Sequence, residues 1–256
     1  MEDSANLIRI IQLSDCHLLG DAAARVKGWD THTLLRQTLA HLALNHGDAD
    51  ALLLTGDLSQ DESLQSYRHL QEYLKPLGIP AYALAGNHDH PALMQAVFNG
   101  EGISCTKAFS AGTWQVLLVN SALDGEVAGY ITESEQQWLE SQLLDNPHTP
   151  TLIATHHPAV NTGSRWLDTL GIKNADALLR IIDQHPQIKA VLSGHIHQEL
   201  TVERNGVFYL ATPSTCFQFK PASDEFALDD RAPAYRWLEL LPHGLFNTGI
   251  EWIASP

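Results

Sequence analysis

The stretch Ala51-Leu52-Leu53-Leu54-Thr55-Gly56-Asp57 decides the fold of this chain. A short apolar run that ends in Gly-Asp is typical of a buried strand that delivers a carboxylate into a turn. In an open α/β sheet, ligands bind beyond the carboxyl ends of the strands. We therefore expect Asp57 to lie where the chemistry of the protein is done.

Four other apolar runs end in the same manner. A single Gly-Asp or His-x-His is a weak signal, because these residues also serve in turns and polar edges. Five such endings at successive strands are hard to assign to turn chemistry, and they predict a metal site at one rim. The four runs lead, in order, from 8–14 into Asp15-Cys16-His17, from 80–85 into Gly86-Asn87-His88-Asp89, from 151–155 into His156-His157-Pro158, and from 188–193 into Gly194-His195-Ile196-His197.

The candidate ligands are too many for one ion. A zinc site typically takes four ligands, whereas seven suit two ions that share one carboxylate at about 3.5–4 Å separation. A set of imidazoles, carboxylates and one amide without Cys favours iron, manganese or zinc. The seven donors are Asp15, His17, Asp57, Asn87, His156, His195 and His197.

The orientation of these donors follows from strand geometry. Alternate residues of an extended segment share a face, so Asp15 and His17 are expected to point the same way and Cys16 into the core. Adjacent residues point to opposite faces, so only one of His156 and His157 can be a ligand. The other histidines lack ligand spacing and are interpreted as surface or capping residues; they are His32, His41, His46, His69, His90, His148, His185 and His243.

The remaining sequence alternates strands with helices and then becomes largely β. Asn205-Gly206 is a strong two-residue hairpin signal in the later half. We predict an α/β fold of two packed sheets flanked by helices, forming one domain over residues 1–256. The expected helix starts are Thr31 for a helix to about His46, Asp61, Pro91 for a helix to about Phe98, Thr132 in a capping box with Glu135, and Asn174.

The amino-acid composition disfavours some classes of binding partner. The formal net charge is −15, from 15 Lys+Arg against 30 Asp+Glu, and a surface this acidic disfavours nucleic acids and anionic membranes. Three widely spaced cysteines fit a reducing compartment. The acidic amino terminus lacks a signal-peptide pattern, and no apolar run reaches the ~18–20 residues of a membrane span. These observations favour a cytoplasmic protein, whose hydrophobic carboxy-terminal strands could form a homodimer interface.

The five motifs in this order resemble those of the calcineurin-like metallophosphoesterases, over roughly residues 8–215. The segments 56–61, 164–168 and 211–219 are further similar to the bacterial class III cyclic-AMP phosphodiesterases. The resemblance implies an α/β/β/α sandwich of two mixed β-sheets. It also implies two divalent ions per chain, Fe²⁺ or Mn²⁺ or alternatively Zn²⁺. It assigns Asp15, His17, Asp57 and His197 to the first ion, and Asp57, Asn87, His156 and His195 to the second.

The same resemblance implies the reaction. A metal-activated hydroxide would hydrolyse 3′,5′-cyclic AMP to 5′-AMP, with His88 as the acid-base residue, and this would lower the cellular cyclic-AMP level. Asp57 and Asn87 are also taken as catalytic, and the expected substrate contacts are His17, Asp57, Asn87, His88 and His197.

Two alternatives remain open from the sequence. The first is another metallophosphoesterase: a phosphomonoesterase, a nucleotide pyrophosphatase, or a broad cyclic-nucleotide or diester hydrolase. Phosphomonoester sites often add arginine clamps, and Arg165 is the only arginine near a motif, which mildly favours a diester. The second alternative is a metal-binding regulatory module without catalysis, and turnover assays separate it from an enzyme.

Overall fold

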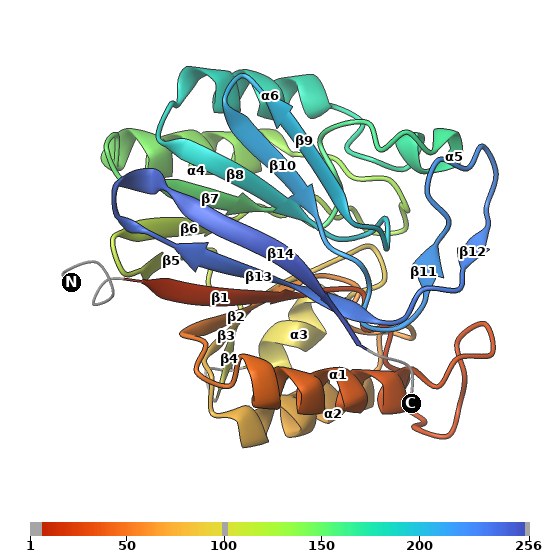
Figure 1. The fold of residues 1–256 in the computed structure, drawn as a ribbon. Helices are drawn as coiled ribbons and strands as arrows, with labels where there is room; N and C mark the ends of the chain where they lie inside the picture. Colours follow the sequence, from red (N-terminus) through yellow and green to blue (C-terminus); the bar gives the residue numbers. More distant parts are fainter. Residues whose placement is uncertain (1–6, 99–101, 254–256) are drawn as a thin grey trace.

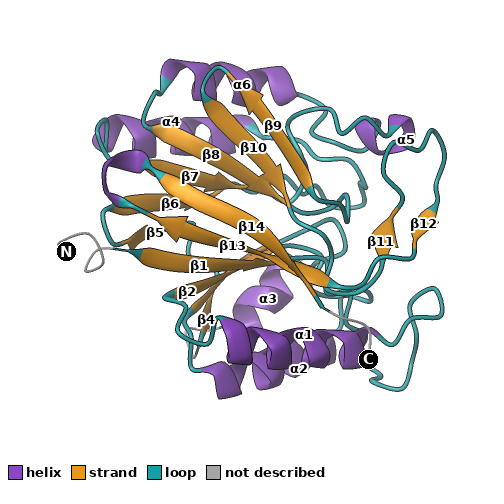
Figure 2. Cartoon of the chain, in the orientation of Figure 1, coloured by secondary structure: helices purple, strands orange, loops and turns teal. Residues whose placement is uncertain are grey.

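The computed structural model describes residues 7–98 and 102–253. Within these ranges, two six-stranded sheets lie face to face with helices on their outer sides, and a short two-stranded sheet projects from one end (Figure 1). Figure 2 shows the helices of the two outer layers separated by the strands of both sheets. The sheets contain both parallel and antiparallel pairs. This arrangement confirms the predicted α/β/β/α sandwich of two mixed β-sheets.

The first sheet is built around β1. Its strands, in spatial order, are β14 (Phe246–Trp252), β13 (Ala234–Leu240), β1 (Ile8–Leu13), β2 (Ala51–Thr55), β3 (Ala81–Leu84) and β4 (Ile103–Ser104). The helices associated with it are α1 (Thr31–Asn45), α2 (Leu64–Leu74) with the 3₁₀ turn Lys75–Leu77, and α3 (Pro91–Val97).

The second sheet begins after the undescribed residues 99–101 and β4. Its strands, in spatial order, are β5 (Ala108–Ala111), β6 (Trp114–Leu118), β7 (Thr151–Ala154), β8 (Ile188–Ser193), β10 (Val207–Ala211) and β9 (Leu200–Arg204). Its helices are α4 (Glu133–Asp145) and α6 (Ala175–Gln184). The short elements are α5 (Arg165–Asp168), β11 (Gln218–Phe219), β12 (Leu228–Asp229) and the 3₁₀ turn Pro242–Gly244.

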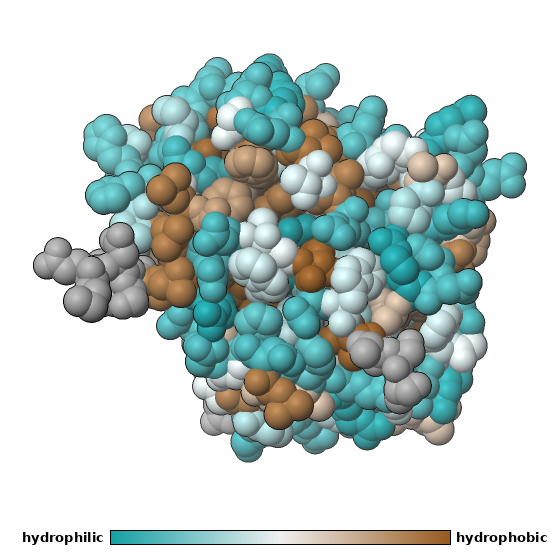
Figure 3. Space-filling view, in the orientation of Figure 1, coloured by the Kyte–Doolittle hydropathy of each residue, from teal (hydrophilic) through white to brown (hydrophobic). Residues whose placement is uncertain are grey.

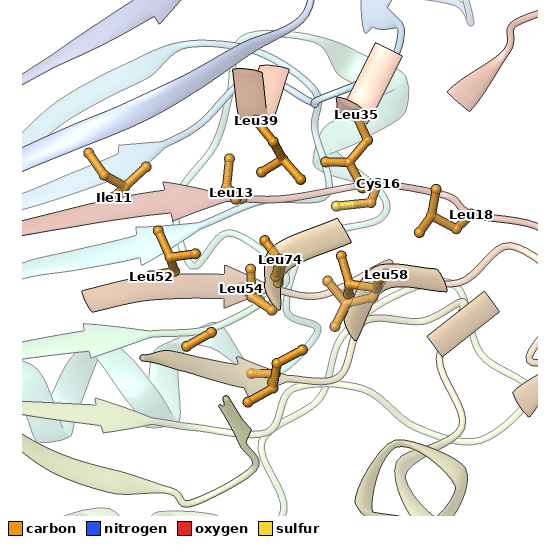
Figure 4. Close-up of a cluster of buried hydrophobic side chains, with 14 of the residues drawn as sticks. Ile11, Leu13, Cys16, Leu18, Leu35, Leu39, Leu52, Leu54, Leu58 and Leu74 are labelled. Atoms are coloured by element: carbon orange, nitrogen blue, oxygen red, sulfur yellow. The ribbon is translucent and has the colours of Figure 1, made fainter. Parts of the chain in front are cut away.

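Side-chain alternation along the strands separates three apolar layers. Leu53 packs between the two sheets, whereas its neighbours Leu52 and Leu54 pack against the helices of the first sheet. A third cluster lies between the second sheet and its helices. Figure 4 shows the layer beneath α1, where Cys16 lies among leucines and is fully buried, as predicted for a small core residue. Burial on both faces explains why the central strands are continuous apolar runs.

Two helix caps differ from the prediction, by one residue at α1 and by two residues at α2. Asp30, and not Thr31, caps α1, because its carboxylate accepts the backbone N–H of Thr33 at 3.0 Å. Ser63, and not Asp61, caps α2. The cap at Thr132 and the Pro91 start are confirmed. Asn174 occupies the cap position of α6, but its side chain makes no capping bond.

The parallel strands of both sheets end at the same side of the molecule. In Figure 1 the arrowheads of β1 and β8 point toward the right of the view. The two ends are bonded to each other: the Gln12 side chain donates to the Thr55 hydroxyl in its own sheet and to the Ser193 carbonyl in the other, both at 3.0 Å. The segments that follow these strands therefore meet at one rim.

The outer surface gives no direct indication of a large apolar patch on the side that Figure 3 shows, where small hydrophobic groups lie among hydrophilic residues. β13 is one of the hydrophobic carboxy-terminal strands behind the homodimer prediction, and its Tyr235, Leu238 and Leu240 are fully buried in the two cores. The homodimer stays a prediction. No helix in the described ranges is both long and apolar enough to cross a bilayer.

Candidate metal centre

Most of the predicted ligands lie just beyond the strand ends in a left-handed backbone conformation. The φ angles are 54° at Asp15, 46° at His17, 49° at Asp57, 65° at His195 and 47° at His197. The prediction of extended segments was therefore wrong in detail. Left-handed non-glycine residues are uncommon and costly, and they persist at functional sites where the surrounding structure holds them. The side chains nevertheless converge as predicted.

One group of donors surrounds His17. Its Nε2 atom lies 3.2 Å from Nε2 of His197 and 3.7 Å from Oδ2 of Asp57. Nε2 of His197 lies 3.3 Å from Oδ1 of Asp15. All four side chains are nearly or fully buried. They are the four residues expected around the first ion.

A second group surrounds His156. Its Nε2 atom lies 3.3 Å from Oδ1 of Asp57, 3.2 Å from Oδ1 of Asn87 and 3.3 Å from Nδ1 of His195. These are the four residues expected around the second ion. Asp57 belongs to both groups, because Oδ2 faces His17 and Oδ1 faces His156.

The tautomers of two histidines indicate that the groups fit cations. Nδ1 of His156 lies 2.8 Å from the Thr55 carbonyl oxygen, and Nδ1 of His197 lies 2.7 Å from that of Phe217. Each Nδ1 must therefore donate a proton, which leaves a lone pair on Nε2 of the neutral ring. Both lone pairs point at carboxylate oxygens, which are also acceptors. A bound cation or an added proton resolves this contact between acceptors.

Without metal, a proton occupies the His156 group. Burial lowers the pKa of His156, but the charge of Asp57 and its hydrogen bond outweigh burial and raise that pKa to about 9. Burial opposes ionisation of Asp57, yet the His156 charge holds the pKa of Asp57 well below its usual range. Burial lowers the pKa of His17 to about 4 and that of His195 well below its usual value. Neutral imidazoles and ionised carboxylates are the forms that bind metals.

His156 keeps one ring nitrogen for the site, whereas His157 keeps none. His157 uses both ring nitrogens, with Nδ1 2.9 Å from the Ser121 hydroxyl and Nε2 3.0 Å from the Val127 carbonyl oxygen. The ring packs so closely on Gly129 that a Cβ there would lie 2.6 Å from it. His157 is thus held by the protein, whereas His156 keeps one nitrogen for the site. The two residues follow β7 rather than extend it, so strand alternation is not what separates them.

Glycine at position 56 allows the two sheets to approach at the site. Its φ is +92°, and a Cβ there would lie 2.5 Å from Nδ1 of His156 and 2.7 Å from the Gly86 nitrogen. Any larger residue would separate Asp57 from His156. The Gly-Asp motif is therefore required by close packing as well as by the turn.

His88 lies at the edge of both groups. Its backbone N–H donates to Oδ1 of Asp57 at 2.8 Å, and its ring meets that of His17 edge-on with centroids 5.2 Å apart. The amide nitrogen of Gln60 lies 3.2 Å from Nδ1 of His88. From the sequence, Asp89 or a backbone carbonyl could orient this imidazole; the Asp89 carboxylate instead accepts from the backbone of Leu58, Ser59 and Gly86 and from the Tyr67 hydroxyl.

The two donor groups open into a cavity of about 300 Å³. Sequence reasoning placed the polar floor of this cavity but did not assign its other walls. Segments 164–168 and 211–219 were identified only by their similarity to a group of phosphodiesterases. No rule of sequence spacing connects their aromatic residues to a ligand. The lining residues without an expected role are Val26, Lys27, Gln60, Val127, Trp166, Leu167, Leu170, Phe217, Phe219 and Phe226.

Of the remaining histidines, His32 contradicts its interpretation as a surface or capping residue. It is 1% exposed, and its ring nitrogens contact the Tyr73 hydroxyl at 3.0 Å and the Leu19 carbonyl oxygen at 2.9 Å. It is a core histidine with both nitrogens satisfied. His90 and His243, by comparison, are exposed as expected.

Comparison with known proteins places these observations in a family. The chain is 41% identical over 244 residues to a 3′,5′-cyclic-nucleotide phosphodiesterase of Nostoc sp., covering 95% of this chain and 92% of that protein. It is 38% identical over 244 residues to the 3′,5′-cyclic adenosine monophosphate phosphodiesterase CpdA of Pseudomonas aeruginosa, covering 95% and 89%. A dimetal phosphatase from Danio rerio shares the fold, with a TM-score of 0.66, 14% identity, and coverage of 96% and 99%.

The match to a protein family spans most of the residues that form the two-sheet sandwich. Residues 8–199 match the family described as calcineurin-like phosphoesterase. This range begins at β1 and includes all five motifs, so the candidate ligands lie within the matched segment. The chain therefore belongs to the calcineurin-like phosphoesterase family.

Proposed function

We propose that this protein hydrolyses 3′,5′-cyclic AMP to 5′-AMP at a dinuclear metal centre. The observation that carries the proposal is the position of Asp57, whose two carboxylate oxygens face two separate groups of donors. The relatives described above are named as phosphodiesterases of cyclic nucleotides and of cyclic AMP, which supports this substrate over the other phosphoesters. Family membership and the converging His and Asp side chains support a metal-dependent hydrolase.

The proposed ligands follow the two groups. Asp15, His17, Asp57 and His197 hold one ion, and Asp57, Asn87, His156 and His195 hold the other. Two divalent ions, Fe²⁺ or Mn²⁺ with Zn²⁺ as the alternative, supply Lewis-acid stabilisation of the phosphoryl oxygens and lower the pKa of water.

The protein side chains then direct the reaction. The water gives up one proton to solvent, its oxygen bonds to phosphorus, the bond from phosphorus to O3′ breaks, and the phosphate stays on C5′. His88 donates the proton that O3′ requires and regains one from solvent. Asn87 and Asp57 fix the turn that carries His88, since the His88 N–H donates to Asp57. The proposed substrate contacts are His17, Asp57, Asn87, His88 and His197.

The product identifies the reaction. Metal-loaded protein is incubated with 3′,5′-cyclic AMP, and the products are separated by chromatography. We expect 5′-AMP to accumulate. Formation of 3′-AMP would contradict the proposed cleavage at O3′, and consumption of 5′-AMP faster than of the cyclic nucleotide would favour a phosphomonoesterase. Metal-loaded protein without turnover of any phosphoester would favour a binding module.

We also propose that residues 1–256 act as one domain, because both sheets contribute ligands to the same site. The three cysteines are free thiols, of which Cys16 and Cys216 are buried. This supports a reducing compartment, and we infer a cytoplasmic location. Thiol labelling of protein in intact cells, against a periplasmic marker in a bacterial host, tests the location.

A further inference from the structure

The cavity above the metal-binding side chains has two chemically different halves. One half is formed by the imidazoles, the carboxylate and the amide of the proposed centre. The other half is apolar and, besides Phe217, includes three aromatic side chains: Trp166, Phe219 and Phe226. We name these three the aromatic wall. A phosphoester with small alkyl groups would occupy the polar half alone, because it has no flat apolar group that could pack against the aromatic side chains of the second half.

The aromatic wall is a contiguous surface. The ring centroid of Trp166 lies 5.1 Å from that of Phe219 and 5.4 Å from that of Phe226, and the centroids of the two phenylalanine rings are 5.6 Å apart. Phe219 also stacks on the ring of His197, with centroids 4.3 Å apart and an interplanar angle of 23°. The wall therefore starts directly beside the first group of metal-binding donors and extends away from it.

The wall is not a closed core. Phe226 is 51% exposed although it lies at a cavity, and Lys27 places its ammonium 4.9 Å from the centroid of this ring. Trp166 is only partly buried, although its indole N–H is itself buried and has no hydrogen-bond partner among the described residues. Aromatic rings that remain accessible beside a catalytic centre can bind a flat ligand by stacking.

The two segments that carry the wall are fixed by polar contacts. α5 carries Trp166, and it projects on the same side of the molecule as the β11–β12 hairpin, at the right of Figure 1. The Asp168 carboxylate accepts the backbone N–H of Thr162 at 2.6 Å and its hydroxyl at 2.8 Å. The Ser223 N–H, in the hairpin loop, donates to the Ser164 hydroxyl at 3.4 Å. The wall is thus preorganised by contacts that the rings themselves do not make.

We propose that the aromatic wall is the nucleobase subsite: of the rings of Trp166 and Phe226, which meet at an interplanar angle of 71°, one stacks on the base and the other contacts its edge, while the phosphate lies at the metal-binding side chains. The proposal rests on the proposed function, since it divides one cyclic nucleotide between the two halves of one cavity. It makes Trp166, Phe219 and Phe226 specificity-determining residues. They distinguish a nucleotide from a small phosphodiester that has the same phosphate.

A binding experiment tests this without relying on turnover. Metal-loaded protein is titrated calorimetrically with 5′-AMP and with ribose 5-phosphate, which lacks the base. We expect the wild type to bind 5′-AMP more tightly, and Trp166→Ala and Phe226→Ala each to reduce that preference by about tenfold, within the range for loss of one base-stacking side chain. Trp166→Phe should retain most of the preference. Leu245→Ala is the matched control, because Leu245 is 66% exposed and lies far from the cavity. It directly precedes β14, at the edge of the first sheet where β13 pairs with the amino-terminal end of β1, opposite to the strand ends that form the site.

A kinetic comparison adds a second readout. The kcat/KM for 3′,5′-cyclic AMP is divided by that for methyl ribofuranoside 3′,5′-cyclic phosphate, and the wall variants should lower this ratio mainly through KM of the nucleotide. Thermal unfolding checks that each variant is folded. Equal weakening of both ligands by Trp166→Ala and Phe226→Ala, or a wild type without preference for 5′-AMP, would overturn the subsite.

The two proposals fail in different ways. A protein that prefers 5′-AMP through Trp166 but does not hydrolyse cyclic AMP retains the subsite and loses the proposed function. A protein that hydrolyses cyclic AMP with an undiminished base preference in both wall variants retains the function and loses the subsite. Binding of neither ligand contradicts both.

Discussion

The Asp89 carboxylate accepts the backbone N–H of Gly86 at 2.9 Å, and this contact closes the turn that carries Asn87 and His88. Each carboxylate oxygen faces two donors: Oδ2 accepts from Gly86 and Leu58, and Oδ1 accepts from Ser59 and the Tyr67 hydroxyl. Asp89 therefore joins the turn after β3 to the turn after β2, on which Asp57 lies.

Asp89→Asn should destabilise both turns. The amide NH₂ would replace an acceptor that two buried donors use, which costs about 1–3 kcal/mol in the free energy of unfolding. We expect a lower midpoint of denaturant unfolding and weaker binding of the second ion, whose proposed ligands include Asn87. Asp124→Asn, at an exposed position, is the control. An unchanged midpoint together with unchanged metal affinity would contradict this role.

His156→Gln and His157→Gln should have different consequences although the residues are adjacent. His157 uses both ring nitrogens within the protein, so its loss should reduce stability by about 1–3 kcal/mol and leave two ions bound. His156→Gln should lose the second ion. Elemental analysis and denaturant unfolding measure the two effects. Loss of an ion from the His157 variant would show that the ligand assignment between these neighbours is wrong.

His88→Ala should affect substrates according to their leaving groups. A ribose 3′ oxygen needs a proton to leave, whereas p-nitrophenolate leaves readily without one. We expect cyclic-AMP hydrolysis to slow by roughly 10²–10⁴-fold, the usual range for acid-base catalysis, with both ions retained. Hydrolysis of bis(p-nitrophenyl) phosphate should slow much less. Equal losses on the two substrates, with metal content intact, would mean that His88 positions the phosphate and does not protonate the leaving group.

Metal binding to the second group should compete with a proton. In the metal-free protein the pKa of His156 is raised to about 9, above its ordinary value, so the proton stabilises the fold below pH ~6.5 and this contribution is lost as the pH rises through about 9. The metal must displace that proton. Its apparent affinity should therefore rise about tenfold per pH unit between pH 7 and 8.5, as measured by calorimetry in buffers of different ionisation enthalpy. An affinity that is independent of pH over this range would contradict the linkage.

The fold and the convergence of the candidate ligands could be predicted because they obey rules of strand patterning. Buried parallel strands are apolar throughout, and their carboxyl ends share one edge, so Asp57 and His195 could be placed together from sequence alone. The backbone at these residues could not be predicted. Alternation assumes extended geometry, whereas Asp15 and His17 are left-handed and held so by contacts across the two sheets.

The features of the site that could not be predicted from the sequence depend on contacts between distant segments. Asp89 is adjacent to His88 in sequence, but its carboxylate reaches the turn after β2, and Gln60 contacts the imidazole. The aromatic wall likewise unites Trp166 with Phe226 from a separate loop. No local sequence pattern predicts this contact between two rings, because it forms only when α5 and the β11–β12 hairpin pack on the sandwich.

Metal stoichiometry of Asp57→Asn tests the central claim most directly. Asp57 offers one oxygen to each group of donors, at 3.7 Å from Nε2 of His17 and 3.3 Å from Nε2 of His156. Replacing the carboxylate by an amide should weaken both metal sites, because the amide nitrogen cannot bind the ion of one group and the oxygen that remains no longer carries negative charge toward the ion of the other. His197→Asn, which alters a ligand of the first group alone, should retain the second ion. After dialysis against a weak chelator, elemental analysis should find Asp57→Asn depleted at both sites and His197→Asn at one. Two tightly held ions in Asp57→Asn would contradict the shared carboxylate.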